Sequence, residues 1–244
     1  PFSDIAGLEI KPASTEDLKR LCEMLINQAN NLKVNTSYQE LDANRKNYVY
    51  YNIFNQASLG YAEASKKYPD LSGKYGSPKP VFMSEFLSYA GIAGIYFPFT
   101  GEANVNIKIP YFMLPNTTCH EMAHQRGFAR EDEANYIAYL ACIAHPDNDF
   151  KYSGTMLALI YSMNALQKYD VDSFNELILK YNEGVTQDLM NLNLFWAKYE
   201  GPIEKTSDKI NNAYLKANLQ KDGTHSYGRM VDLLLAEQNK EIKR

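Results

Sequence analysis

The feature that most constrains this chain is a pair of histidines four positions apart, in the stretch HEMAH at residues 120–124. On an α-helix, residues i and i+4 lie one turn apart on the same face. His120 and His124 can therefore aim imidazole nitrogens at one metal ion about 2.0–2.1 Å away. Glu121 stands beside that ion, where its carboxylate can act as general base towards a water molecule. The pentad predicts a metal-dependent hydrolytic site on a helix over about 117–126.

The residues around the pentad predict the limits of this helix. Cap-type residues stand immediately upstream, at positions 115–118. Gly127 follows shortly after the second histidine and predicts a helix stop. A chain that turns there can bring a third ligand back to the metal.

The third ligand is expected from the next helix, predicted over about 131–145. A catalytic zinc site uses three protein ligands and leaves a fourth position for water. Glu131 would begin this helix, and Asn135 would lie one turn later on the same face, where it can support a ligand by hydrogen bonding. Glu131 is favoured as the ligand and Glu133 is its rival. Asp132 is interpreted as an acid that complements the helix dipole.

Hydrophobic periodicity predicts helices along most of the chain. No repeat, low-complexity tract or linker divides it, so we expect a single domain over residues 1–244. An N-terminal helix begins near Ser14, and Asp17 takes the place of the usual Glu or Gln of a capping box. Further helices are predicted over about 42–67, 117–126, 131–145, 153–168, 171–181, 184–199, 203–219 and 226–239.

Strand character is concentrated in one segment, about 94–110. Aromatic and β-branched residues surround a turn at Thr100 and Gly101, and Val105, Ile107 and Ile109 then alternate with polar residues. This pattern predicts a small hairpin or edge sheet before the active-site helix. The fold class expected is therefore mainly α, of the α+β kind.

Composition narrows the choice of partners. Lysine and arginine number 25 against 29 acidic residues, and no basic face stands out, so we expect no nucleic-acid partner.

The longest near-apolar run, about 86–99, is shorter than the roughly 20 residues of a membrane helix. Cys119 and Cys142 are expected to be small buried residues. The chain begins at Pro1 rather than Met, which predicts a processed protein or a fragment.

With H-E-x-x-H followed by the E-x-x-A-N segment of residues 131–135, the sequence resembles the gluzincin branch of the zincin metallopeptidases, which includes thermolysin. The resemblance implies a zincin-like fold, a bound Zn²⁺, and Glu131 as the third zinc ligand. Two departures are visible. Only six residues separate His124 from Glu131, far fewer than in thermolysin, and Arg130 occupies the place of the third histidine of the metzincins.

More narrowly, the stretch CHEMAHQRGFAREDEANYIAYLAC (119–142) is similar to an uncharacterised bacterial family, catalogued only as a domain of unknown function. The segments YFPFTGEANVN (96–106) and SYGRMVDLLLAE (226–237) share this resemblance. Members of that family look like membrane-anchored proteins with N-terminal transmembrane helices and an extracytoplasmic zincin-like domain. The resemblance implies anchoring through segments absent from this sequence, and a location at the extracytoplasmic face of the bacterial cell membrane.

The zincin resemblance also implies roles for residues outside the metal cluster. In zincins an edge strand above the active-site helix pairs with the extended substrate, a role that falls here to the segment from Gly101 to Ile107. A donor for the tetrahedral oxyanion is also needed. Tyr227 is the favoured candidate and His225 the alternative. His145, at a predicted helix end, is expected to be a dipole partner without a catalytic role.

Two functional hypotheses follow. The first is a zinc-dependent metallopeptidase acting on a peptide or protein substrate, with His120, His124 and Glu131 as ligands. In it Glu121 passes a proton from water to the leaving amine. The alternative is a non-catalytic envelope sensing or scaffolding domain with a structural or vestigial zinc site. An intact Glu121 favours the peptidase, because a purely structural site has no need of a base there.

Overall fold

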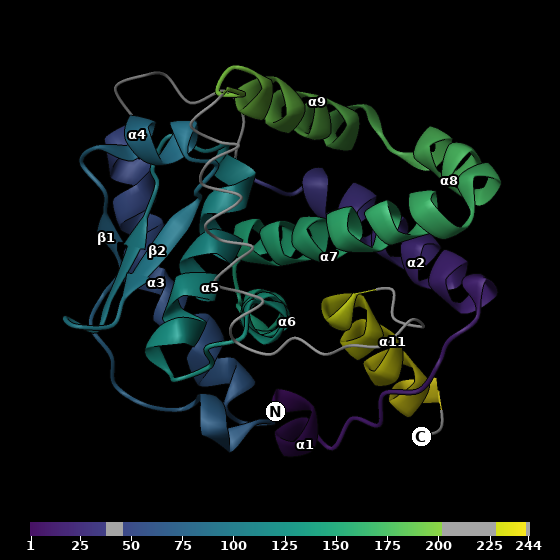
Figure 1. Ribbon diagram of the computed structural model, residues 1–244, viewed down its shortest axis with the longest axis horizontal. Coiled ribbons are helices and arrows are strands. Elements are labelled where there is room, and N and C mark those ends of the chain that lie inside the picture. Colours follow the sequence, from purple (N-terminus) through teal and green to yellow (C-terminus); the bar gives the residue numbers. More distant parts are fainter. Residues whose placement is uncertain (38–45, 202–227, 243–244) are drawn as a thin grey trace.

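The chain folds mainly into helices, with a small sheet on one side (Figure 1). The computed structural model describes residues 1–37, 46–201 and 228–242. The helices are α1 (Phe2–Ala6), α2 (Thr15–Lys33), α3 (Lys46–Ala64), α4 (Ser84–Tyr89), α5 (Leu114–Gln125), α6 (Glu131–Ala144), α7 (Asn148–Tyr169), α8 (Val171–Leu177), α9 (Glu183–Ala197) and α11 (Arg229–Ile242). Short 3₁₀ turns lie at Pro69–Leu71, Tyr111–Met113 and Ile178–Lys180. The predicted mainly helical fold with a small sheet is confirmed.

The predicted helices are present with shifted ends wherever the structure describes them. The predicted helix over 171–181 is divided into α8 and a 3₁₀ turn, and α7 begins five residues before its predicted start. The predicted helix over 203–219 lies outside the described residues. The sequence does not predict α1 or α4, because segments of five or six residues are too short to show a period.

Helix α2 begins with the capping box that its sequence suggests. The Ser14 side chain accepts a hydrogen bond from the Asp17 backbone N–H at 3.1 Å. In return the Asp17 carboxylate accepts from the Ser14 backbone N–H at 3.0 Å. Aspartate therefore replaces the usual glutamate in this motif, because its shorter side chain still reaches the N-cap amide.

The sheet has the strand order β1-β3-β2, formed by β1 (Lys79–Pro80), β2 (Gly94–Phe97) and β3 (Glu102–Val105). Strands β2 and β3 pair antiparallel as the predicted hairpin, and β1 pairs parallel with β3. The central strand is therefore β3, and the prediction of an edge strand over Gly101–Ile107 is wrong. Among the residues that the structure describes, strand β2 is an edge strand instead. The alternation of residues in the sequence predicts the strand β3 itself. It does not predict β1, a two-residue strand from a proline-containing loop, which pairs with β3 on its other side and makes β3 central.

The near-apolar run over about 86–99 does not form one element. It contains the end of α4, a turn and β2. Among the helices that the structure describes, none combines the length and apolar character needed to cross a bilayer.

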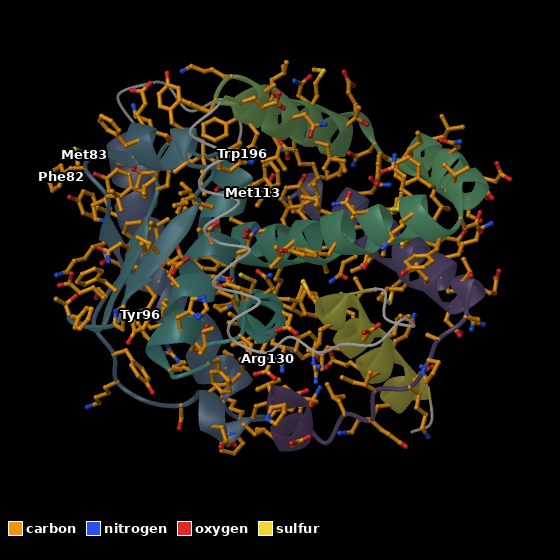
Figure 2. The ribbon with its side chains drawn as sticks, viewed as in Figure 1. Phe82, Met83, Tyr96, Met113, Arg130 and Trp196 are labelled. Atoms are coloured by element: carbon orange, nitrogen blue, oxygen red, sulfur yellow. The ribbon has the colours of Figure 1, made fainter. Side chains whose placement is uncertain are left out.

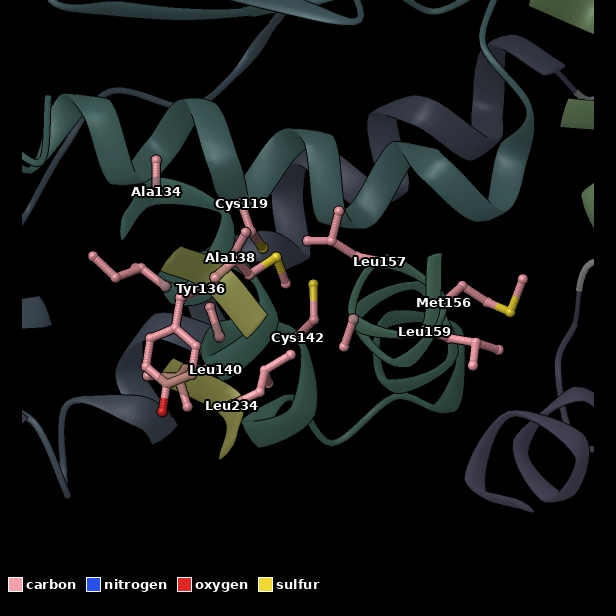
Figure 3. Packing of buried hydrophobic residues seen from close by; sticks show 14 of the residues in the cluster. Cys119, Ala134, Tyr136, Ala138, Leu140, Cys142, Met156, Leu157, Leu159 and Leu234 are labelled. Carbon is pink, nitrogen blue, oxygen red and sulfur yellow. The ribbon is translucent and has the colours of Figure 1, made fainter. Parts of the chain in front are cut away.

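Helix α6 lies at the centre of the core and packs against α3, α5, α7 and α11. Small side chains allow the close approach. A Cβ at Gly60 on α3 would lie 2.3 Å from the Ala141 carbonyl oxygen, and one at Gly154 on α7 would lie 2.5 Å from Cys142 Cβ. Figure 3 shows the side chains of Cys119, Ala138 and Cys142 gathered between these helices. The predicted burial of Cys119 and Cys142 is confirmed, and both are free thiols.

Candidate metal centre

Helix α5 carries the pentad and begins earlier than the sequence predicts. It starts at Leu114 with Pro115 in its first turn, where a missing N–H costs no helical hydrogen bond. Residues 116–118, expected as an upstream cap, therefore lie inside the helix and are buried. Asn116 donates from its backbone N to Ser153 Oγ at 2.9 Å and from Nδ2 to Ser153 O at 3.1 Å. The polar side chain of Asn116 therefore makes a contact with α7 instead of capping α5. The local sequence does not indicate this contact.

The end of α5 matches the prediction. Gly127 adopts a φ of 91°, a left-handed conformation that favours glycine, and its N–H donates to the His124 carbonyl at 3.0 Å. The chain then reverses, and α6 begins at Glu131. Because α5 and α6 pack closely, this short connection returns Glu131 to the histidine face of α5.

The His120, His124 and Glu131 side chains converge into a cluster that can hold a metal ion. The two Nε2 atoms lie 3.0 Å apart. A Glu131 oxygen lies 3.1 Å from His120 Nε2, and the other oxygen lies 3.5 Å from His124 Nε2. Tetrahedral zinc ligands at about 2.0–2.1 Å from the ion are about 3.3 Å from one another. The two carboxylate distances belong to different Glu131 oxygens and, like the distance between the nitrogens, lie close to that value, so the cluster could hold a metal ion.

The hydrogen bonds behind the two imidazoles set their tautomers. His120 Nδ1 lies 2.8 Å from Asn135 Oδ1, and His124 Nδ1 lies 2.7 Å from the Phe128 carbonyl oxygen. Both partners are acceptors, so each Nδ1 carries the hydrogen and donates it. Each neutral ring then presents the lone pair of Nε2 to the other ring. Two Nε2 atoms at 3.0 Å, each within 3.5 Å of a Glu131 oxygen, favour either a metal ion or a proton that is donated to the carboxylate.

The rival ligand Glu133 points elsewhere. It is buried, and its Oε1 accepts a hydrogen bond from the Phe2 backbone N–H at 3.1 Å. The same oxygen lies 4.0 Å from Nε of Arg130. Asp132, in the first turn of α6, is paired with the Arg130 guanidinium at 3.1 Å. Of the three consecutive acids that begin α6, Glu131 is the one that reaches the histidines.

Glu121 lies beneath strand β2 and is almost fully buried, with 4% of its surface exposed. A Cβ at Gly94 would lie 2.5 Å from Glu121 Oε1, so a glycine at this point of β2 lets the strand lie on the carboxylate. Burial raises the pKa of the Glu121 carboxyl, and the negative charge of Glu131 adds to this. The two imidazoles and a hydrogen bond from the Tyr96 backbone N–H offset only part of the rise in pKa.

The charges within the cluster support one another. Burial opposes ionisation of Glu131, yet hydrogen bonds and Coulomb attraction from His120 and His124 hold its pKa well below the usual range. Burial alone would lower the pKa of His124. The hydrogen bond to Glu131, with the charges of Glu121 and Glu131, outweighs burial and raises it. The pocket therefore favours positive charge at the position that a metal ion would take.

Three other histidine and tyrosine predictions have different outcomes. Tyr227 and His225, the candidate oxyanion donors, lie outside the described residues. The structure does not support the interpretation of His145 as a partner of the helix dipole, and its expected lack of a catalytic role stays a prediction. His145 is fully buried, its Nδ1 accepts from the Asp147 N–H at 3.0 Å, and its Nε2 donates to the Gln56 carbonyl at 3.1 Å. Burial lowers its pKa, so the ring is neutral.

The sequence analysis does not predict two tyrosines that lie near the His120, His124 and Glu131 cluster. The Tyr96 ring stacks on the His124 ring with centroids 6.3 Å apart, and Figure 2 shows Tyr96 on the sheet side of α5. The Tyr161 hydroxyl on α7 accepts a hydrogen bond from Asn135 Nδ2 at 2.9 Å. Nothing in the local pattern of a tyrosine-rich chain distinguishes these two from packing residues.

The fold and the cluster define a helix-rich protein with an H-E-x-x-H helix and a candidate metal centre. A family model described as a protein of unknown function (DUF3810) matches residues 1–235, so the chain belongs to that family. The predicted membership of a family of unknown function is thereby confirmed. Comparisons with curated proteins and with solved structures give no match.

Replacing the third ligand should separate Glu131 from Glu133. We expect Glu131→Gln to weaken zinc binding by at least about 100-fold, because a ligand contributes more than the 10- to 100-fold of its supporting hydrogen bonds. Glu133→Gln should leave zinc affinity unchanged. The measurement is a zinc titration against a competing chromogenic chelator. A larger loss for Glu133→Gln than for Glu131→Gln would contradict the assignment.

Zinc affinity should fall as the pH is lowered, because zinc and a proton compete for Nε2 of His124. The pKa of His124 is raised, so the metal-free protein retains this proton to a higher pH than an ordinary histidine. Below that pKa we expect the apparent affinity to drop about tenfold per pH unit. The same titration at about pH 6, 7 and 8 measures it. An affinity that does not change over this range would count against the histidine ligands.

Proposed function

We propose that this protein is a zinc-dependent metallopeptidase of the gluzincin type, which hydrolyses peptide bonds in a peptide or protein substrate. His120, His124 and Glu131 hold the zinc ion, and Glu121 is the general base. The observation that carries the proposal is the pair of Nε2 atoms 3.0 Å apart, with the Glu131 carboxylate beside them. This is the ligand set of a catalytic zinc site with three protein ligands.

A zinc ion bound here supplies Lewis-acid activation of water and of the scissile carbonyl group. The protein's own residues keep the site ready for it. Asn135 and the Phe128 carbonyl hold both imidazoles in the tautomer that leaves Nε2 free. Glu131 contributes a negative charge that offsets part of the charge of the ion.

Glu121 is suited to move a proton between water and the leaving group. A general base works best when its pKa lies near the working pH, and burial raises the pKa of Glu121 in that direction. In the forward reaction Glu121 takes one proton from the attacking water. It then gives this proton to the nitrogen of the departing amine as the C–N bond breaks, which restores the carboxylate.

Strand β2 is the surface that we assign to the substrate backbone. Gly94 lies against the Glu121 carboxylate and the Tyr96 ring stacks on the His124 ring, so β2 borders the candidate metal centre. Its side turned away from β3 has no strand partner among the described residues. An extended peptide can add to such an edge by main-chain hydrogen bonds. This assignment moves the substrate-binding role from Gly101–Ile107 to Gly94–Phe97.

The alternative function is an envelope sensing or scaffolding domain whose zinc site is structural or vestigial. The observation in its favour is the near-complete burial of Glu121 against Gly94. For either function, we propose anchoring in the bacterial cell membrane through segments absent from this sequence, with the domain on the extracytoplasmic face. The support for this location is the resemblance of residues 119–142 to membrane-anchored proteins.

Glu121→Gln should abolish hydrolysis and leave zinc bound. The amide keeps the shape of the side chain but cannot take up a proton, so we expect turnover to fall about 10²- to 10⁴-fold. Zinc content is measured by elemental analysis, and cleavage by mass spectrometry of a peptide library. Glu133→Gln is the matched control, with activity retained. Hydrolysis by Glu121→Gln at the wild-type rate would refute the assigned base, and bound zinc without cleavage in the wild type would favour the scaffold.

Gly94→Ala should separate positioning of the base from metal binding. The new methyl group would press on Glu121 Oε1, and a displacement of about 1 Å can cost about 100-fold in rate. We expect a loss of turnover of about 10- to 100-fold with zinc content unchanged. Gly76→Ala is the control, because a Cβ there has no neighbour within 4 Å. Full activity of Gly94→Ala would exclude tight contact between β2 and Glu121 during catalysis.

A further inference from the structure

A chain of hydrogen bonds leads from His120 away from the metal position into α7. His120 Nδ1 donates to Asn135 Oδ1 at 2.8 Å, and Asn135 Nδ2 donates to the Tyr161 hydroxyl at 2.9 Å. The three residues come from α5, α6 and α7, the helices that form the centre of the fold. The last member of this chain has no part in the function proposed above.

The middle position of this chain is an amide, and an amide has two different ends. A carboxylate would offer an acceptor in either orientation, but asparagine offers an acceptor on one side and a donor on the other. A reversed Asn135 amide would direct its N–H groups at His120 Nδ1. That nitrogen would then need a lone pair, and the ring hydrogen would move to Nε2, where it blocks metal binding. The orientation of Asn135 therefore decides whether His120 can be a ligand.

We propose that Tyr161 is a positioning residue of the metal centre, which accepts the Asn135 amide hydrogen in the one orientation that leaves His120 Nε2 free for a metal ion. The inference rests on metal binding in the proposed function. A hydroxyl group can donate as well as accept, so the bound ion sets the direction of the chain and Tyr161 supports that direction. An ion on Nε2 would draw electron density from the imidazole and would strengthen each donor behind it. The Tyr161 hydrogen bond is therefore stronger in the metal-bound protein than in the metal-free protein.

The surroundings of Tyr161 suit this role. Burial of its hydroxyl and the negative charge of Glu131 raise the pKa of Tyr161, so the group stays neutral. About two-fifths of the residue, 41%, is exposed to solvent. Replacement by phenylalanine therefore removes the hydroxyl without disturbing a tightly packed core residue.

A double-mutant cycle on zinc affinity tests the proposal. Tyr161→Phe should weaken zinc binding by about three- to tenfold, less than the 10- to 100-fold of a partner that contacts the ligand directly. The Asn135→Asp background should reverse the effect. An aspartate at position 135 can only accept hydrogen bonds, so the Tyr161 hydroxyl must donate to it. This hydrogen bond would withdraw negative charge from the carboxylate that accepts the His120 Nδ1 hydrogen. In that background, loss of the hydroxyl should leave zinc affinity unchanged or raise it.

The readout is the zinc dissociation constant of all four proteins by chelator competition, with denaturant unfolding midpoints to confirm equal folding. Tyr169→Phe, near the end of the same helix, is the control and should not change zinc affinity. An equal loss in both backgrounds would show that Tyr161 acts through packing, and no loss in the wild-type background would also overturn the proposal. Wild-type protein that binds no zinc, or binds it independently of His120, would refute the proposed function as well. Normal dependence on His120 with an unchanged Tyr161→Phe would refute this inference alone.

Discussion

The convergence of two imidazole nitrogens on one carboxylate is the constraint on which the arrangement around the cluster depends. The Nε2 atoms of His120 and His124 lie 3.0 Å apart, and their side chains are only 14% and 11% exposed. Charges at partly buried positions are screened less than exposed ones, so the negative charge of Glu131 strongly favours a positive charge at these nitrogens. The Glu131 carboxylate completes the arrangement and itself becomes easier to ionise. The geometry therefore selects for a cation, and each neighbouring element can be understood by how it holds these three side chains together.

Close helix packing provides the rigidity that such an arrangement needs. Glycines on α3 and α7 let both helices approach the small side chains of α6, so the helix that carries Glu131 is held on two sides. Arg126, just past the end of α5, lies between the rings of Tyr61 and Tyr75, at 3.6 and 4.4 Å from their centroids. It also donates to the Leu71 carbonyl at 3.0 Å. This arginine attaches the loop before the sheet to helix α5, and a partly buried guanidinium is well suited to stacking on aromatic rings.

The main contribution of the small sheet to the candidate site is one contact between strand β2 and Glu121. Strand β2 lies on α5, and Gly94 brings its backbone against the Glu121 carboxylate. A carboxylate buried in this way holds a proton more readily than an exposed one, because desolvation penalises the charged form. The same contact places β2 beside the histidines. Glu121, the two histidines and strand β2 thus depend on one another through a single close approach of backbone to side chain.

The sequence by itself determined the local features of this protein. Histidines at i and i+4, a glycine that stops the helix and Glu131 at the start of the next helix are all properties of near neighbours in the chain, and the period of a helix fixes their relative placement. The family of unknown function and the mainly helical class were equally accessible. Tertiary structure alone decided that Glu131 rather than Glu133 reaches the histidines, since the backbone N–H of Phe2, more than a hundred residues away, donates to the Glu133 carboxylate. It also decided that β2 rather than β3 is an edge strand, and that Asn135 is bonded to Tyr161. These outcomes depend on contacts between distant segments, which the spacing of residues along the chain does not record.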